Sequence, residues 1–196
     1  MTARDLWLIR HGETEWSALG QHTSWTELEL TEEGVREVLA VKPLLRGRNF
    51  SLVLSSPRSR AVRTAELAGF EPTIDEDLKE WDYGALEGMT IEEIRKQYPG
   101  WSIWGGPWPG GEHPDDVAAR ADRVIERALA VAGPEPVLLF AHGHILRALG
   151  ARWLRRPPTD GYLLKLGTAT VSILGWEHGE PVVSNWNVPA DTGQLG

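Results

Sequence analysis

The chain contains no cysteine among its 196 residues, which excludes disulfide bonds, thiolate chemistry and cysteine-ligated metal sites. It has no apolar run near the roughly 18 residues of a membrane span and no signal-peptide pattern, so we expect a cytoplasmic protein. Basic residues are in the minority, because 20 Lys and Arg stand against 28 Asp and Glu, a formal net charge of −8. This charge disfavours nonspecific binding to nucleic acid or anionic membranes, so any anion site must be local.

Short apolar runs alternate with helix-like segments along the chain. Strand-like runs occupy residues 6–9, 52–54 and 137–141, and helical patterns occupy 58–68, 91–98, 117–132, 145–154 and part of 28–46, where Thr31 is the expected N-cap. A closing hairpin is expected over 169–176 and 181–186. The alternation predicts one domain over residues 1–196, an α/β fold with a mostly parallel central sheet between two helical layers.

Residues 98–116 differ from the rest of the chain. They hold five glycines, four prolines and three tryptophans, with neither Lys nor Arg. We interpret the stretch as a lid-like loop, with the alternative that its rings only pin it to the body of the domain. The last residues, about 190–196, are expected to be a loose tail. The ten tryptophans leave a homodimer face possible.

Two histidine motifs follow the two most apolar strand-like runs. Arg10, His11 and Gly12 come directly after residues 6–9, and His142 and Gly143 come directly after residues 137–141. Ligands of open α/β sheets bind beyond the carboxyl ends of the strands, so the two motifs are expected to meet there. Arginine matches phosphate oxygens with a planar charged fork, and a neutral imidazole can attack phosphorus. A single histidine after a strand is more often structural, but the combination indicates one phosphate site.

Four segments, in order, resemble the signature of the histidine phosphatase, or phosphoglycerate-mutase-like, superfamily. They are LIRHGETEW at 8–16, SSPRSRAVRTA at 55–65, LKEWDYGALEG at 78–88 and FAHGHILR at 140–147. The resemblance runs from about residue 6 to 176 and implies a phosphoglycerate-mutase-like three-layer αβα sandwich.

The resemblance also implies catalytic roles. His11 is the implied nucleophile that forms a phosphohistidine, Arg10, Arg60 and His142 surround the phosphoryl oxygens, and Glu80 is the proton donor. Phosphoryl transfer depends mostly on positioning and electrostatic stabilisation, which these residue types supply. Arg58 and Arg63 are interpreted as surface or supporting residues.

Other assignments stay open at this point. Glu13, Asp82 and Glu87 compete with Glu80 as proton donor, although Glu87 is interpreted as a contact to loop backbone. His142 and His144 could be read as a metal pair, but the arginine cradle would repel a divalent cation, so we expect neither metal nor cofactor.

The resemblance favours a phosphatase over a mutase. Ser17 stands where the mutases usually carry asparagine, and residues 98–116 lack the basic clamp for a second phosphate. Phosphoglycerate mutase-type transfer, a phosphoprotein-directed or noncatalytic signalling role, and a carbohydrate-binding module based on the tryptophans remain as alternatives.

Parts of the chain look like bacterial acid phosphatases and, about equally, like the sedoheptulose-1,7-bisphosphatase branch. The implied partner is a small phosphorylated metabolite, and we expect activity to favour mildly acidic pH. Capping of loops is the alternative for Ser17 and Thr23. The full set of candidate substrate contacts is Ser17, Gln21, His22, Thr23, Gly143 and Trp104.

Overall fold

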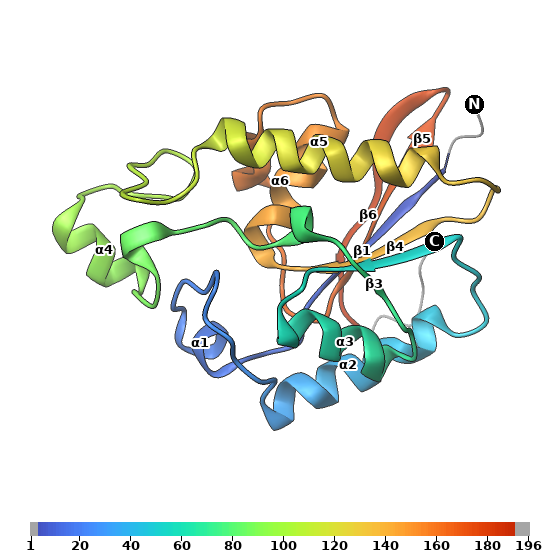
Figure 1. Ribbon diagram of the computed structural model, residues 1–196, viewed down its shortest axis with the longest axis horizontal. Helices are drawn as coiled ribbons and strands as arrows, with labels where there is room; N and C mark the ends of the chain where they lie inside the picture. Colours follow the sequence, from blue (N-terminus) through green and yellow to red (C-terminus); the bar gives the residue numbers. More distant parts are fainter. Residues whose placement is uncertain (1–3, 191–196) are drawn as a thin grey trace.

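The computed structural model describes residues 4–190, so most of the expected tail at 190–196 lies outside the described residues. Six strands form one sheet in the order β3-β2-β4-β1-β5-β6 (Figure 1). The first four in that order run parallel, and β5 and β6 are antiparallel to their neighbours, which confirms the mostly parallel sheet. The strands are β1 Leu6–Arg10, β2 Leu52–Ser55, β3 Thr73–Ile74, β4 Val137–Ala141, β5 Val171–Glu177 and β6 Glu180–Val188.

Helices cover both faces of this sheet. In the view of Figure 1, α5 and α6 lie above it and α2 and α3 below it, while α1 and α4 extend at one end. No helix within residues 4–190 is long and apolar enough to cross a membrane. The α-helices are α1 Glu15–Leu19, α2 Glu32–Leu45, α3 Ser59–Ala68, α4 Ile91–Gln97, α5 Pro114–Ala130 and α6 Gly143–Trp153, and short 3₁₀ turns are η1 Glu76–Leu78, η2 Gly84–Leu86 and η3 Pro158–Leu163.

The central strand β1 is apolar throughout because both of its faces are buried. Leu6 and Leu8 join the core beneath α5 and α6, whereas Trp7 and Ile9 join the core beneath α2 and α3. Successive side chains of a strand point to opposite faces, so an uninterrupted apolar run is what a sheet covered on both sides requires.

Local signals at helix termini explain where the expected boundaries held and where they were wrong. Thr31 caps α2 as expected, accepting from the Gly34 N–H. Helix α5 begins at Pro114 rather than at 117, because His113 and Asp116 form a capping box, so the last residues of the lid-like stretch belong to the helix. Helix α6 begins at Gly143, two residues earlier than expected, and no sequence pattern predicted α1.

A close backbone approach fixes the loop after β1. A Cβ on Gly12 would lie 2.6 Å from the Gly34 carbonyl oxygen, and a Cβ on Gly34 would lie 2.2 Å from the Glu13 carbonyl oxygen. Both positions therefore need glycine. Their contact holds the loop that carries His11 against the first turns of α2.

Residues 98–116 pack on the body of the domain through their rings. Trp101 is 2% exposed, and its indole N–H donates to the Pro107 carbonyl oxygen at 2.8 Å. The Trp108 indole N–H donates to the Ile103 carbonyl oxygen at 2.7 Å. Both of these bonds lie within the stretch itself, but the Trp101 ring also joins the core beneath α5 and α6 and packs edge-on against His22. That packing fits the alternative in which the rings pin the loop, and a moving lid stays a prediction.

Candidate active site

The carboxyl ends of three parallel strands bring the sequence motifs together. In the sheet register, Arg10 pairs with Ala141 and Ser55 pairs with Phe140. The residues that follow these strand ends therefore share one edge of the sheet. The ring centroids of His11 and His142 lie 5.2 Å apart, with a steep angle between the rings.

His11 is held as a neutral imidazole that is protonated on one ring nitrogen. Its side chain is 5% exposed, and its Nδ1 lies 2.8 Å from the Gly12 carbonyl oxygen. A carbonyl only accepts, so Nδ1 carries the proton and Nε2 keeps its lone pair. Burial holds the pKa of His11 well below 6.5, and the charges of Arg10 and Arg60 lower it further.

The two arginines are anchored by backbone carbonyl groups. The Arg10 guanidinium donates to the Leu166 carbonyl oxygen at 2.8 Å. Arg60 is fully buried, and its guanidinium donates to the carbonyl oxygens of residues 23, 24 and 26. Within residues 4–190, the Nε atoms of both arginines and Nδ1 of His142 are buried without a hydrogen-bond partner.

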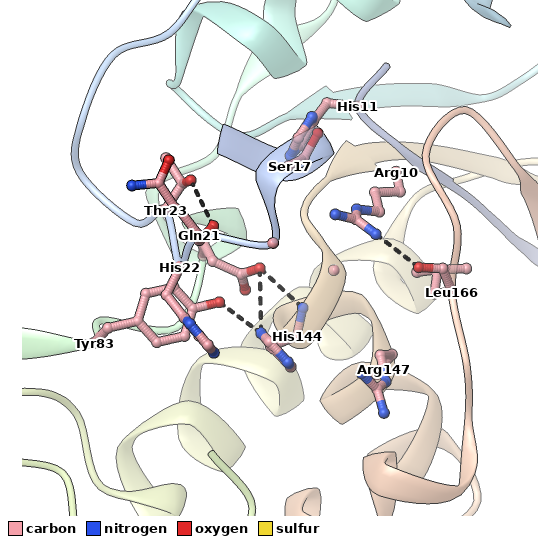
Figure 2. A pocket seen from close by; sticks show the side chains of 13 residues that line it. Arg10, His11, Ser17, Gln21, His22, Thr23, Tyr83, His144, Arg147 and Leu166 are labelled. Carbon is pink, nitrogen blue, oxygen red and sulfur yellow. Dashed lines mark hydrogen bonds and ion pairs between the residues drawn. The ribbon is translucent and has the colours of Figure 1, made fainter. Parts of the chain in front are cut away.

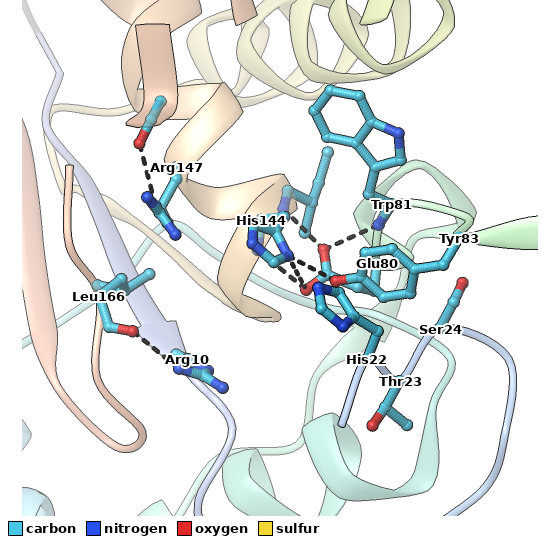
Figure 3. A network of polar contacts seen from close by, with 12 residues as sticks. Arg10, His22, Thr23, Ser24, Glu80, Trp81, Tyr83, His144, Arg147 and Leu166 are labelled. Carbon is cyan, nitrogen blue, oxygen red and sulfur yellow. Dashed lines mark hydrogen bonds and ion pairs between the residues drawn. The ribbon is translucent and has the colours of Figure 1, made fainter. Parts of the chain in front are cut away.

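Glu80 lies at the N-terminus of α6 (Figure 3). Its carboxylate accepts hydrogen bonds from the backbone N–H groups of Trp81, His144 and Ile145 at 2.8, 2.9 and 2.8 Å. The last two belong to the first turn of α6, where backbone N–H groups have no acceptor within the helix. The helix therefore fixes where Glu80 lies.

Arg10, His11 and Glu80 border a cavity of about 230 Å³. Figure 2 shows the segment with Gln21, His22 and Thr23 on one side and Arg10, Leu166 and Arg147 on the other. Arg60 and His142 are not among the described lining residues, since both are fully buried. The lining residues are Arg10, His11, Ser17, Gly20, Gln21, His22, Thr23, Glu80, Tyr83, Gly143, His144, Arg147 and Leu166.

Several candidate contacts on the cavity wall already have backbone partners. The Ser17 hydroxyl completes the capping box of α1 with Thr14, which is the alternative interpretation of that residue. The Gln21 amide donates to the Gly88 carbonyl oxygen at 2.7 Å, and Nδ1 of His22 lies 2.9 Å from the Met89 carbonyl oxygen. The wall is thereby held to the segment that follows Glu80.

Trp104 is absent from the described lining residues and contributes indirectly. The Arg147 guanidinium carbon lies 4.6 Å from the centroid of a Trp104 ring, a cation–π distance. The Trp104 ring also packs edge-on against the rings of His144 and Trp81. Trp104 thus supports the cavity wall through Arg147 and His144, and its direct contact with substrate stays a prediction.

The comparisons with known proteins agree with this geometry. A model of the histidine phosphatase superfamily (branch 1) matches residues 6–189. The chain belongs to this superfamily. An acid phosphatase of Mycobacterium tuberculosis is 41% identical over 179 residues, covering 89% of this chain and 87% of the relative. A sedoheptulose 1,7-bisphosphatase of Saccharomyces cerevisiae is 32% identical over 179 residues, covering 74% of this chain and 66% of the relative.

Solved structures show the same fold. An open reading frame of Mycobacterium tuberculosis matches with a TM-score of 0.91 and 38% identity over 95% of this chain and 98% of that chain. A mycobacterial glucosyl-3-phosphoglycerate phosphatase matches with a TM-score of 0.83 and 30% identity over 95% and 99%. The phosphoglycerate-mutase-like fold expected from the motifs is confirmed.

The competing acids of this histidine phosphatase are engaged elsewhere. Glu87 accepts from the backbone N–H groups of Ser24 and Thr26, which confirms its interpretation as a loop contact. Glu13 accepts from the Thr31 hydroxyl at 2.8 Å, and Asp82 accepts from the Gly84 N–H at 2.8 Å. Of the four candidates, Glu80 alone is among the described cavity residues.

The other two arginines of the second motif form ion pairs with glutamates. Arg58 pairs with Glu27, and Arg63 pairs with Glu66. Residues 4–190 contain no group of three or more His, Asp or Glu arranged to hold a metal ion.

Sequence reasoning gave no substrate-binding role to three polar side chains of the cavity wall, Tyr83, His144 and Arg147. The Tyr83 hydroxyl lies 2.5 Å from Nδ1 of His144, and Arg147 lies one helical turn after Gly143 on α6. All three stand inside the quoted motifs, at 78–88 and 140–147. The helical spacing from Gly143 to Arg147 was the available signal for a second cation at this site.

Proposed function

We propose that this histidine phosphatase hydrolyses small phosphomonoesters in two steps through a phosphohistidine on His11. The names of its relatives, an acid phosphatase and a sedoheptulose 1,7-bisphosphatase, support this class of reaction. A small phosphorylated metabolite as partner and a cytoplasmic location belong to the same proposal.

One observation carries the proposal: unpaired buried donors surround a nucleophilic nitrogen. Nε2 of His11 carries a lone pair, and within residues 4–190 the buried side-chain atoms without a hydrogen-bond partner are Nε of Arg10, Arg58 and Arg60 and Nδ1 of His142. The charges of Arg10 and Arg60 act on His11, and the His142 ring centroid lies 5.2 Å from that of His11. Leaving buried donors unpaired costs about 1–3 kcal/mol each. An anion with several acceptor oxygens, bound beside His11, would satisfy them at once.

In the first step, Nε2 of His11 attacks phosphorus and the bond between phosphorus and the ester oxygen breaks. Glu80 transfers its proton to the leaving oxygen, so an alcohol departs rather than an alkoxide. Arg10, Arg60 and His142 stabilise the charge on the equatorial phosphoryl oxygens. In the second step, Glu80 takes a proton from water, the water oxygen attacks phosphorus, and the bond between nitrogen and phosphorus breaks to release phosphate.

The cavity favours small substrates with polar leaving groups. Its volume is about 230 Å³, and the residues beyond His11 include Gln21, His22 and Arg147. Gln21 and Arg147 offer N–H donors to hydroxyl groups of a leaving alcohol, and Nε2 of His22 offers an acceptor because Nδ1 of His22 donates to the Met89 carbonyl oxygen. The reaction uses no metal in this proposal, because the donor set around His11 is cationic and attracts anions.

The test is phosphate release, in the presence of a chelator, from p-nitrophenyl phosphate, sugar mono- and bisphosphates, phosphoglycerates and phosphoserine. His11→Ala is the blank, since a residue beyond a strand end contributes little to core packing. We expect release from several of these substrates by the wild-type enzyme and none by the variant. No release above the blank, or equal release by both proteins, would overturn the proposal.

A further inference from the structure

Ser56 is a buried serine that the sequence motif contains but that has no role in the reaction above. It follows β2 directly, is fully buried, and its backbone N–H donates to the Phe140 carbonyl oxygen at 2.9 Å. Its hydroxyl oxygen lies 2.7 Å from Nε2 of His142, which is also fully buried. The two side chains therefore meet where β2 and β4 end side by side.

Counting hydrogen atoms gives the direction of this bond. The Ser56 hydroxyl oxygen already accepts from the Arg58 backbone N–H at 3.3 Å. A hydroxyl has one hydrogen to donate, and within residues 4–190 the remaining polar atom at hydrogen-bond distance from it is Nε2 of His142. If Nε2 were the donor instead, both the buried hydroxyl hydrogen and the lone pair of Nδ1 would be left without a partner in these residues. Ser56 is therefore the donor, and Nε2 of His142 accepts with its lone pair.

His142 is neutral, so its single ring proton then lies on Nδ1. Burial holds the pKa of His142 well below 6.5, with further lowering by the charges of Arg60, His11 and Arg10. Nδ1 is the ring nitrogen without a hydrogen-bond partner in residues 4–190. A protonated Nδ1 of His142 is a hydrogen-bond donor beside His11. An unprotonated Nδ1 would instead present a lone pair, which repels phosphoryl oxygens.

We infer that Ser56 is a positioning residue that fixes His142 in the tautomer protonated on Nδ1, so that His142 donates to the phosphoryl group. The catalytic consequence rests on the proposed function, but the tautomer itself does not. Because the contact serves the phosphoryl group and not the leaving group, its loss should affect alkyl and aryl phosphates alike.

The first test reads the tautomer directly, in the full chain labelled with ¹⁵N-histidine. Two-bond proton–nitrogen spectra distinguish a protonated Nδ1 from a protonated Nε2, and His142→Gln assigns the signals. We expect Nδ1 of His142 to be protonated in the wild-type protein, and Ser56→Ala to populate the other tautomer. A wild-type His142 protonated on Nε2 or on both nitrogens, or a tautomer unchanged in Ser56→Ala, would overturn the inference.

The second test is kinetic and has a matched control. Ser55 is the neighbouring buried serine, and its hydroxyl donates to the Ser56 carbonyl oxygen instead of to a histidine. We expect Ser56→Ala to lower kcat/KM by about tenfold to a hundredfold for p-nitrophenyl phosphate and sugar phosphates alike. Ser56→Thr, which keeps the hydroxyl, should restore most of the activity, and Ser55→Ala should stay within about threefold of wild type.

The two proposals fail in different ways. A wild-type enzyme that releases no phosphate overturns the proposed function, while the nuclear magnetic resonance test still decides the tautomer. Activity in the wild type together with an undiminished Ser56→Ala overturns the inference alone. Equal losses in Ser56→Ala and in a folded Ser56→Thr also overturn it, because they indicate a packing role.

Discussion

The free nitrogen of His11 sets the pH range in which the reaction can start. Burial and the charges of Arg10 and Arg60 hold the pKa of His11 well below 6.5, so the neutral nucleophile persists as the pH falls through that value. An unperturbed histidine would be about nine-tenths protonated one pH unit below its pKa of about 6.5. We therefore expect kcat/KM for p-nitrophenyl phosphate to fall by much less than tenfold between about pH 7 and 5.5. A rate that climbs steadily from about pH 5 to 9 would contradict this.

The contribution of Glu80 to the rate should depend on how much the leaving group of the substrate needs a proton. Glu80→Gln removes the proton donor, and its single amide oxygen can replace Oε1 as the acceptor for the N–H groups of Trp81 and Ile145. Its NH2 group then faces the His144 N–H, which loses its acceptor, so some loss should be common to all substrates. We expect kcat/KM to fall by about 10²- to 10⁴-fold for alkyl phosphates and far less for p-nitrophenyl phosphate, whose phenolate leaves without help.

Asp82→Asn provides the matched acid for comparison. Asp82 stands two residues from Glu80 and accepts from the Gly84 N–H, so its amide can keep that bond. Its kcat/KM should stay within about threefold of wild type for both substrate types, by the usual small effect of a substitution that keeps its contacts. Equal losses for Glu80→Gln on alkyl and aryl phosphates would argue against the proton-donor role.

Among the elements, the segment from Gln21 to Thr26 depends on contacts from outside itself. Glu87 holds the backbone N–H groups of Ser24 and Thr26, while Arg60 binds carbonyl oxygens of the same segment. Glu87→Ala removes the acceptor for two buried or half-buried donors, which should lower the free energy of unfolding by about 1–3 kcal/mol. The cavity wall should loosen as well, so KM should rise more than kcat falls.

Urea unfolding and steady-state kinetics measure both effects. Glu66→Ala is the control, because its partner Arg63 is as exposed as Glu66 itself, and surface pairs contribute at most about 1 kcal/mol. A Glu87→Ala enzyme with unchanged KM and unchanged stability would show that the segment holds its place without this carboxylate.

The elements that could be predicted are those whose sequence signal lies within the element itself. The strands β1 and β4 followed from uninterrupted apolar runs, and the start of α2 followed from Thr31. The five residues of α1 are too few for a helical period, and its capping box uses Thr14 and Ser17, which looked like loop residues.

In the site, too, local motifs could be recognised from the sequence, whereas long-range contacts could not. Arg10, His11 and Glu80 could be assigned from motifs, but the partners that orient them are remote in sequence. Arg60 reaches three carbonyl oxygens more than thirty residues away, and Tyr83 meets His144 across 61 residues. Contacts of this kind follow from the packing of loops on the sheet, which no local pattern encodes.

For the whole molecule, the sheet explains why the site is both rigid and reachable. Cores on the two faces of the sheet hold β1, β2 and β4, and the reactive residues follow their carboxyl ends. Oligomeric state is a separate matter, and the homodimer stays a prediction. Trp25 is 44% exposed. Sedimentation equilibrium of the wild-type protein and of Trp25→Ser would test whether this side chain contributes to a homodimer.

The buried histidines should make the whole fold sensitive to mild acid. The pKa values of His11, His142 and His144 lie well below 6.5, and that of His22 is also lowered, in each case first through burial. The unfolded chain therefore binds more protons than the folded one once the pH falls to about 6.5. Stability is full above that pH and is lost as the pH falls toward the folded pKa values, by up to about 1.4 kcal/mol per pH unit for each group.

Urea unfolding in phosphate-free buffer, at about pH 7 and 5.5, measures this loss without ligand stabilisation. Carboxylates with lowered pKa values, such as Asp77 and Glu27, act only at lower pH, so they do not obscure it. His144→Gln keeps a hydrogen-bonding partner for the Tyr83 hydroxyl and should reduce the pH dependence by about one proton. His178→Asn, at an exposed hairpin turn, is the control and should leave the pH dependence unchanged. A midpoint that does not move between the two pH values would mean that the folded protein accommodates charged histidines, contrary to the neutral site on which the proposed chemistry depends.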